Sequence, residues 1–129
     1  MKRYVKHQNI YGMAAVGIVD GYEIYVNTND GGNNAHFHYR KKNNWDEFHT
    51  CIMIEEAEYF HHDGKEDVLN SKQRKLLDEF LRSKVTIARY ADKFVNNWEL
   101  ICFLWDINNS DKMIPEDTEM PDYRQLPTK

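Results

Sequence analysis

Apolar and polar residues alternate along four short segments in the first half of the chain, a pattern typical of strands with one buried face. The predicted strands cover residues 13–19, 22–28, 35–42 and 48–57. Asp20 and Gly21 separate the first two, and this dipeptide favours a tight hairpin because it tolerates positive φ. Turn-forming residues also follow the second and third segments. The pattern predicts a four-stranded antiparallel meander.

The alternation also divides the side chains of the third strand between two faces of the sheet. One face receives the aromatic residues Phe37 and Tyr39. The other, which we call the histidine face, receives His36, His38 and Arg40. Because antiparallel sheets commonly bury one face and leave the other wet, we expect both helices to cover the aromatic face. The histidine face is then expected to be exposed.

The short turn between the third and fourth strands sets their register. It places His38 opposite Cys51 and Arg40 opposite His49, and paired residues share a face. Tyr25 of the second strand lies nearby in this topology. The sequence therefore predicts that titratable and aromatic side chains from three strands gather on the histidine face.

Apolar residues recur at helical spacing in the second half of the chain. Residues 71–84 follow Asn70, which forms a capping-box pattern with Gln73, and they predict a first helix. An amphipathic stripe over residues 86–108 predicts a second, longer helix of about five turns. Strands followed by helices indicate the α+β class.

We predict one α+β domain over residues 1–110 and an extended or disordered acidic tail over 111–129, where three prolines interrupt any helix. The second helix carries more large apolar residues than one stripe can bury. Either the sheet wraps around this helix or part of it is a homodimer contact. The residues concerned are Trp98, Phe103, Leu104 and Trp105.

Composition narrows the function classes. A chain of 129 residues with 41% hydrophobic content supports one core. The net charge of −4 disfavours bulk binding to nucleic acid. Cys51 and Cys102 lack a CxxC spacing and predict buried thiols in a reducing compartment. No apolar run approaches the about 18–20 residues of a membrane helix, so we expect a cytoplasmic protein without a membrane partner.

Two histidines at alternate positions of a strand can reach a single metal ion. If a metal binds, His36 and His38 are its candidate ligands, and zinc or manganese is the candidate ion. The spacing matches no specific zinc motif, so we expect a polar face that needs no cofactor, with the metal site as the alternative. Candidates for the remaining ligands are His49 and Cys51 on the next strand, and Asp30, His62 and Asp63 in loops.

Three functions stay open on these residues. The leading one is a non-enzymatic interaction or regulatory protein that binds a protein partner or a small anionic ligand, because no catalytic set is recognisable. Its ligand-binding residues would be His36, His38, Arg40, His49 and Tyr25. The second is a metal-dependent phosphodiesterase or nuclease that uses the histidine pair. The third is a protein that sequesters a nucleotide in a basic and aromatic pocket.

Three segments occur in order along the chain: NNAHFHYR, LNSKQRKLLDEFL and NNWELICFLWDINN. They resemble a family of small uncharacterised bacterial and phage proteins with a PPHFHV-like strand and an Asn-Trp-Glu element near the end. The resemblance covers roughly residues 22–108. This chain has Asn33-Asn34 in place of the prolines, and a longer tail. Family members lie beside a second small gene in arrangements like toxin–antitoxin pairs, so the resemblance implies an interaction or regulatory protein.

Overall fold

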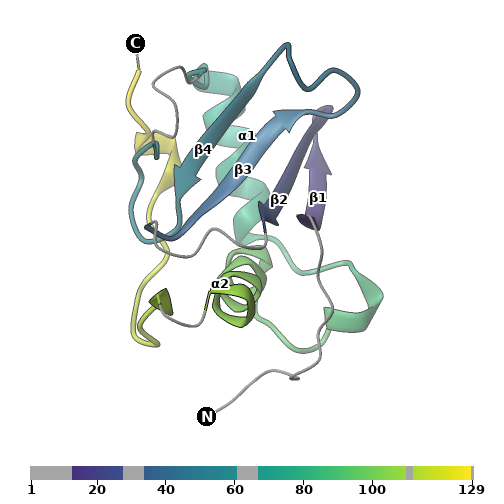
Figure 1. The fold of residues 1–129 in the computed structure, drawn as a ribbon, viewed down its shortest axis with the longest axis vertical. Helices are drawn as coiled ribbons and strands as arrows, with labels where there is room; N and C mark the ends of the chain where they lie inside the picture. The colour runs from purple at the N-terminus through teal and green to yellow at the C-terminus, as the bar shows by residue number, and fades with distance from the viewer. Residues whose placement is uncertain (1–12, 28–33, 61–66, 110–111, 129) are drawn as a thin grey trace.

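The computed structural model describes residues 13–27, 34–60, 67–109 and 112–128 (Figure 1). These residues form four strands, β1 (Met13–Val19), β2 (Tyr22–Asn27), β3 (His36–Lys41) and β4 (His49–Met53). Two helices follow, α1 (Ser71–Arg82) and α2 (Asn97–Asn108), with 3₁₀ turns η1 (Ala88–Tyr90) and η3 (Tyr123–Gln125). The strands form one antiparallel sheet in the order β1-β2-β3-β4. The predicted α+β fold with a meander sheet is confirmed.

The hairpin between β1 and β2 is the predicted tight turn, with φ of 51° at Asp20 and 84° at Gly21. Gly17, in β1, is needed for close packing and not for a turn. A Cβ atom at Gly17 would lie 2.6 Å from Cζ of Phe80, so the missing side chain lets α1 pack closely on β1. Gly17 pairs with Ile24, which places α1 on the aromatic face of the sheet.

Strand β4 ends at Met53, four residues earlier than the predicted end of residues 48–57. The chain reverses there, because the Met53 amide donates to the carbonyl of Glu58 (2.9 Å). The Phe60 amide then donates to the carbonyl of Cys51 (2.9 Å). This reversal carries Phe60 back alongside β4.

Helix α1 begins with the predicted capping box. The Asn70 side chain accepts from the amide of Gln73 (2.8 Å), and the Gln73 side chain accepts from the amide of Asn70 (2.8 Å). These two bonds satisfy donors that a helix start otherwise leaves unpaired. The helix ends at Arg82, two residues before the predicted end.

The prediction that residues 86–108 form one long helix is wrong for residues 86–96, because α2 begins only at Asn97. The side chain of Asn96 caps this start by accepting from the amide of Glu99 (2.9 Å). The apolar residues before Asn96 are still used for packing, but from turns. Tyr90 and Phe94 contact the ring of Phe103, with centroids 5.9 and 5.1 Å away.

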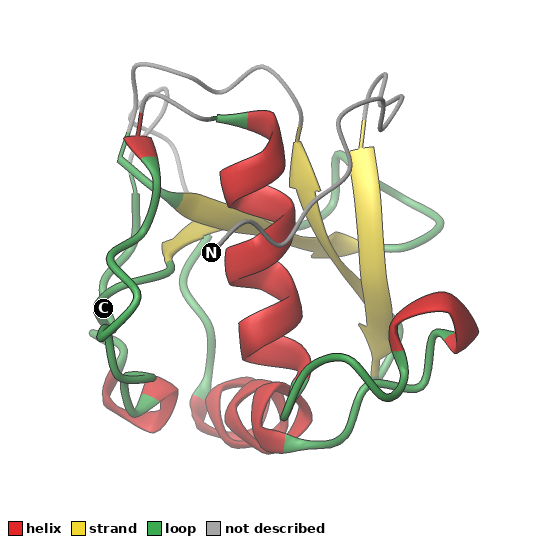
Figure 2. Ribbon diagram, turned by 90° about the horizontal axis from the view of Figure 1, so that it is seen from below, coloured by secondary structure: helices red, strands yellow, loops and turns green. Residues whose placement is uncertain are grey.

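Asn97 joins the end of α1 to the start of α2. It is buried, and its Nδ2 donates to the carbonyls of Phe80 (2.9 Å) and Ser83 (3.2 Å). Its own amide donates to the same Ser83 carbonyl (3.0 Å). Figure 2 shows α2 along its length and α1 nearly end-on, so the two helices cross at this point.

Replacing Asn97 by alanine is expected to lower the free energy of unfolding by about 2–3 kcal/mol, because buried carbonyls lose a donor. The neighbouring variant Asn96→Ala removes only a helix cap and is expected to cost about 1 kcal/mol. Urea denaturation of both variants measures the difference. A larger loss in Asn96→Ala than in Asn97→Ala would contradict the bridging role.

Nearly every side of α2 is buried within the chain, including Trp98, Phe103, Leu104 and Trp105. Of the two explanations for its many apolar residues, packing inside the chain accounts for these four. A homodimer stays a prediction. No helix in the described part of the chain has both the length and the apolar character needed to cross a membrane.

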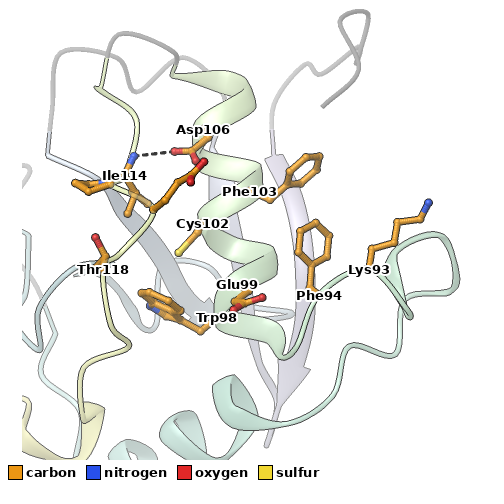
Figure 3. A pocket seen from close by; sticks show the side chains of 11 residues that line it. Lys93, Phe94, Trp98, Glu99, Cys102, Phe103, Asp106, Ile114 and Thr118 are labelled. Atoms are coloured by element: carbon orange, nitrogen blue, oxygen red, sulfur yellow. Dashed lines mark hydrogen bonds between the residues drawn. The ribbon is translucent and has the colours of Figure 1, made fainter. Parts of the chain in front are cut away.

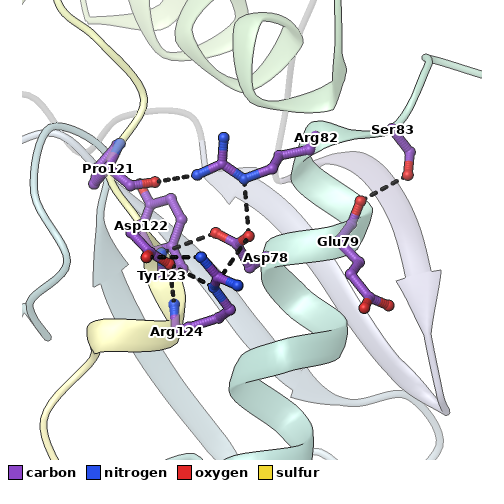
Figure 4. Close-up of polar contacts among 8 residues, drawn as sticks. All are labelled: Asp78, Glu79, Arg82, Ser83, Pro121, Asp122, Tyr123 and Arg124. Atoms are coloured by element: carbon purple, nitrogen blue, oxygen red, sulfur yellow. Dashed lines mark hydrogen bonds and ion pairs between the residues drawn. The ribbon is translucent and has the colours of Figure 1, made fainter.

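The C-terminal residues 112–128 are extended and packed against α1 and β4 (Figures 1 and 4). The Tyr123 hydroxyl donates to the carbonyls of Met53 (2.9 Å) and Ile54 (2.8 Å), and its amide donates to Oδ1 of Asp78 (2.9 Å). Burial raises the pKa of the Tyr123 hydroxyl, which therefore stays protonated as the donor. The described part of this tail contributes Ile114, Tyr123 and Leu126 to the core.

The carboxylate of Asp78 also lies near two guanidinium groups (Figure 4). Nε of Arg82, one turn further along α1, donates to Oδ2 (2.8 Å). Arg124 lies 4.0 Å from the same oxygen and pairs with Asp122 (2.9 Å), and this guanidinium lowers the Asp122 pKa to about 2. Asp78 is thus the point at which the C-terminal segment is fastened to α1.

Candidate metal centre

The histidine face forms in the predicted register. His38 lies opposite Cys51 on β4 and opposite Tyr25 on β2, and Arg40 lies opposite His49. Paired residues on neighbouring strands share a face. The five side chains predicted to bind a ligand, those of His36, His38, Arg40, His49 and Tyr25, therefore lie on one face of three adjacent strands.

The expectation that this face is exposed is wrong. His36 is 0% exposed, His38 3% and Arg40 5%. The ring of Phe60 stacks on His36 with centroids 4.4 Å apart, and Trp105 of α2 lies 5.5 Å from the same ring. Both helices were expected on the aromatic face, but α2 reaches the histidine face with Trp105.

Three buried side chains on this face bring metal-binding atoms together. One nitrogen each of His36 and His38 and the sulfur of Cys51 all lie within 4.8 Å of one another. Sγ of Cys51 is 3.4 Å from Nδ1 of His38. We call these three residues the His-Cys cluster. It contains both predicted histidine ligands and one of the two predicted ligands from the neighbouring strand.

The backbone orients the His36 ring. Nδ1 of His36 lies 2.8 Å from the carbonyl oxygen of Asn34, so this nitrogen donates the hydrogen bond. In the neutral ring, Nε2 then keeps its lone pair. Histidine ligands in metalloproteins are commonly held by such a bond from the other ring nitrogen.

His49 lies at the rim of the cluster. Its Nε2 is 2.9 Å from Nδ1 of His38 and 3.5 Å from the Tyr25 hydroxyl, but the residue is exposed. Its backbone amide donates to Oδ2 of Asp67 (2.9 Å). The loop candidates Asp30, His62 and Asp63 lie outside the described residues.

Arg40 is enclosed by side chains of the chain itself. Its Cζ lies 3.0 Å from the centroid of the Trp45 ring and 4.3 Å from that of Tyr25. A terminal nitrogen lies 3.7 Å from Oε1 of Glu23. Lys41, the next cation on β3, pairs with Glu47 (3.7 Å). Two aromatic rings and one carboxylate thus pack around the Arg40 guanidinium, and binding of a small anionic ligand on this face stays a prediction.

Sequence reasoning missed the aromatic residues Trp45, Phe60 and Trp105 around this face. Trp45 sits in a turn, Phe60 follows an acidic turn, and Trp105 belongs to a helix that was expected elsewhere. The sequence offers one indication of this covering. Tyr59 and Phe60 are adjacent aromatic residues within an acidic segment, which indicates that the chain packs against the core there.

A cavity of about 410 Å³ lies apart from the cluster, between α2 and the segment after residue 112 (Figure 3). Its wall includes Phe94, Trp98 and Cys102, and Oδ1 of Asp106 accepts from the Ile114 amide (2.9 Å). Residues of the His-Cys cluster are not part of its lining. The two cysteines therefore lie in different places: Cys51 belongs to the cluster, and Cys102 lines the cavity.

No protein-family model, curated protein or solved structure matches the chain. The family resemblance of the three sequence segments therefore stays a prediction, as do a bacterial or phage origin and the cytoplasmic location.

Proposed function

We propose that the protein binds one transition-metal ion between His36, His38 and Cys51. The observation that carries this proposal is the convergence of their three donor atoms within 4.8 Å in a buried position. Imidazole nitrogen and thiolate sulfur are the donors that zinc and neighbouring transition metals prefer. Oxygen-preferring ions such as Mg²⁺ and Mn²⁺ are less suited to this set.

The distance between two of the donors supports a shared ion. Zinc binds imidazole nitrogen at about 2.0–2.1 Å and thiolate sulfur at about 2.3 Å, so tetrahedral geometry separates these atoms by about 3.5 Å. Sγ of Cys51 and Nδ1 of His38 are 3.4 Å apart. This separation needs no shift of β3 against β4, but an ion bound to Nδ1 of His38 would replace the contact of this nitrogen with Nε2 of His49 (2.9 Å).

Burial of the ligands favours a structural or regulatory ion over hydrolysis. His36, His38 and Cys51 are each at most 3% exposed. Catalytic zinc needs a coordination position that water and substrate can reach. The phosphodiesterase and nuclease alternatives therefore have less support than an interaction or regulatory protein whose folded state depends on metal loading. Binding of a protein partner stays a prediction.

The test is a zinc titration of tag-free, metal-depleted protein against a chromophoric chelator, together with elemental analysis of the loaded sample. We expect one ion per chain. At a free zinc concentration of 100 times Kd, the ion should stabilise the fold by about 2.7 kcal/mol. Removing a group that only supports a ligand typically lowers metal affinity by roughly 10- to 100-fold. Cys51→Ser removes a ligand, so it should lower the zinc affinity by more than this.

Cys102→Ser is the matched control, because it makes the same substitution in the wall of the separate cavity. This variant should keep the zinc affinity of the unaltered protein, and circular dichroism should show both variants folded. Equal affinity of Cys51→Ser and the unaltered protein would reject the proposed site. Loading far below one ion per chain would also reject it.

A further inference from the structure

A methionine on β4 pairs with one residue of the His-Cys cluster. Met53 pairs directly with His36 across β3 and β4, and it follows Cys51 by two residues on β4. Directly paired residues point to the same face, with Cβ atoms about 4.5–5.5 Å apart. The half-buried Met53 side chain therefore shares the histidine face with both His36 and Cys51.

We propose that the site selects monovalent copper and that the Met53 thioether contributes to this selection as a ligand. This inference rests on the proposed metal site. Thiolate and thioether sulfur are soft ligands that favour Cu⁺. Structural zinc sites use cysteine, histidine and carboxylate ligands, so a thioether adds little for Zn²⁺. The face thus offers two nitrogen and two sulfur donors from two paired strands.

The charge of the cluster favours the same ion. Two neutral imidazoles and one thiolate carry one negative charge, which Cu⁺ neutralises and Zn²⁺ exceeds by one. Phe60 and Trp105 pack on His36, and a net charge in such surroundings is costly.

The binding step involves no change of oxidation state. Copper enters and stays as Cu⁺, while the Cys51 thiol releases its proton to solvent and forms the bond from sulfur to copper. The Nδ1–H of His36 keeps its hydrogen bond to the Asn34 carbonyl, so Nε2 is the nitrogen that binds. Chelator-bound Cu⁺ under anaerobic conditions is therefore a sufficient source of the ion.

The experiment compares Cu⁺ and Zn²⁺ affinities of the full, metal-depleted chain in parallel competition titrations. Cu⁺ is supplied as its bicinchoninate complex without oxygen, and Zn²⁺ is measured against a chromophoric chelator. Met53→Leu conserves shape and should fold normally. Because a ligand is lost, it should lower Cu⁺ affinity by at least the about 10- to 100-fold that is typical of removing a supporting group, and it should leave Zn²⁺ affinity unchanged. Met120→Leu, a half-buried methionine in the C-terminal segment, should change neither affinity.

Each outcome bears on one of the two proposals. Cu⁺ affinity that is unchanged in Met53→Leu overturns the copper inference, while zinc binding that depends on Cys51 leaves the metal site standing. If Met53→Leu lowers the affinities for Cu⁺ and Zn²⁺ equally, selection by the thioether is also overturned. If the unaltered protein binds neither ion, both the inference and the proposed function are rejected.

Discussion

Replacing Tyr123 by alanine is expected to lower the free energy of unfolding by about 3–5 kcal/mol, the usual cost of deleting a buried aromatic ring. The Tyr123 ring is fully buried and packs edge-on against Phe37, with centroids 5.8 Å apart. Its hydroxyl donates to two carbonyls at the end of β4. One side chain thus fixes the C-terminal segment to the sheet, and urea denaturation measures the effect.

Two further variants separate the contributions of this residue. Tyr123→Phe keeps the ring and loses only the hydroxyl, so about 1–3 kcal/mol is expected. Arg124→Ala, on the exposed neighbour, removes surface ion pairs and should cost about 1 kcal/mol or less. If Tyr123→Ala costs no more than Arg124→Ala, the segment does not contribute to the core as described.

The order of the C-terminal segment could not be predicted from its own residues. Its prolines and acidic residues give neither a helical nor a strand period, and its few buried apolar residues are widely spaced. It is held instead by contacts to distant groups. The bond from the Tyr123 amide to Asp78 joins residues 45 positions apart, and no local pattern encodes such a pair.

Local signals predicted the turns and caps correctly because the chemistry that they depend on is local. Asp20 and Gly21 form the tight hairpin, and Asn70 and Gln73 form the capping box. The strand register also followed from turn length and alternation. These features need only neighbours in sequence or in the adjacent strand.

The second helix shows how spacing alone misleads. Apolar residues continue at helical intervals through Tyr90 and Phe94, and the stripe looks unbroken. The structure packs these two residues from turns, while Asn96 caps a helix that starts after them. Two adjacent asparagines were the available signal, because asparagine is a favoured N-cap residue.

The candidate site was predictable in membership but not in burial. Period-two geometry places His36, His38 and Cys51 on one face wherever β3 and β4 pair in this register. Whether water reaches that face depends on which other segments cover it. Phe60 and Trp105 cover His36. The reversal after β4 positions Phe60 and the crossing of α2 over α1 positions Trp105, and the spacing of apolar residues predicts neither.

Trp105→Ala is expected to cost about 3–5 kcal/mol of unfolding free energy, because a fully buried indole leaves a large cavity. Its Nε1 donates to the carbonyl of Lys112 (2.9 Å), and its ring contacts His36. The variant should therefore also weaken zinc binding by about 10- to 100-fold, since His36 loses one wall that orients its ring. Urea denaturation and the chelator titration measure the two effects on the same sample.

Trp45→Ala is the matched control, because the same side chain is removed where 54% of it is exposed. Its ring contacts the buried Arg40 guanidinium, and a cation–π pair is worth about 0.5–1 kcal/mol at exposed sites and about 2 kcal/mol when desolvated, which is less than the loss expected for Trp105→Ala. Equal stability losses in the two variants would contradict the enclosure of the histidine face by α2. A large loss in Trp105→Ala with unchanged zinc affinity would restrict Trp105 to the core and leave the orientation of His36 to the Asn34 carbonyl and Phe60.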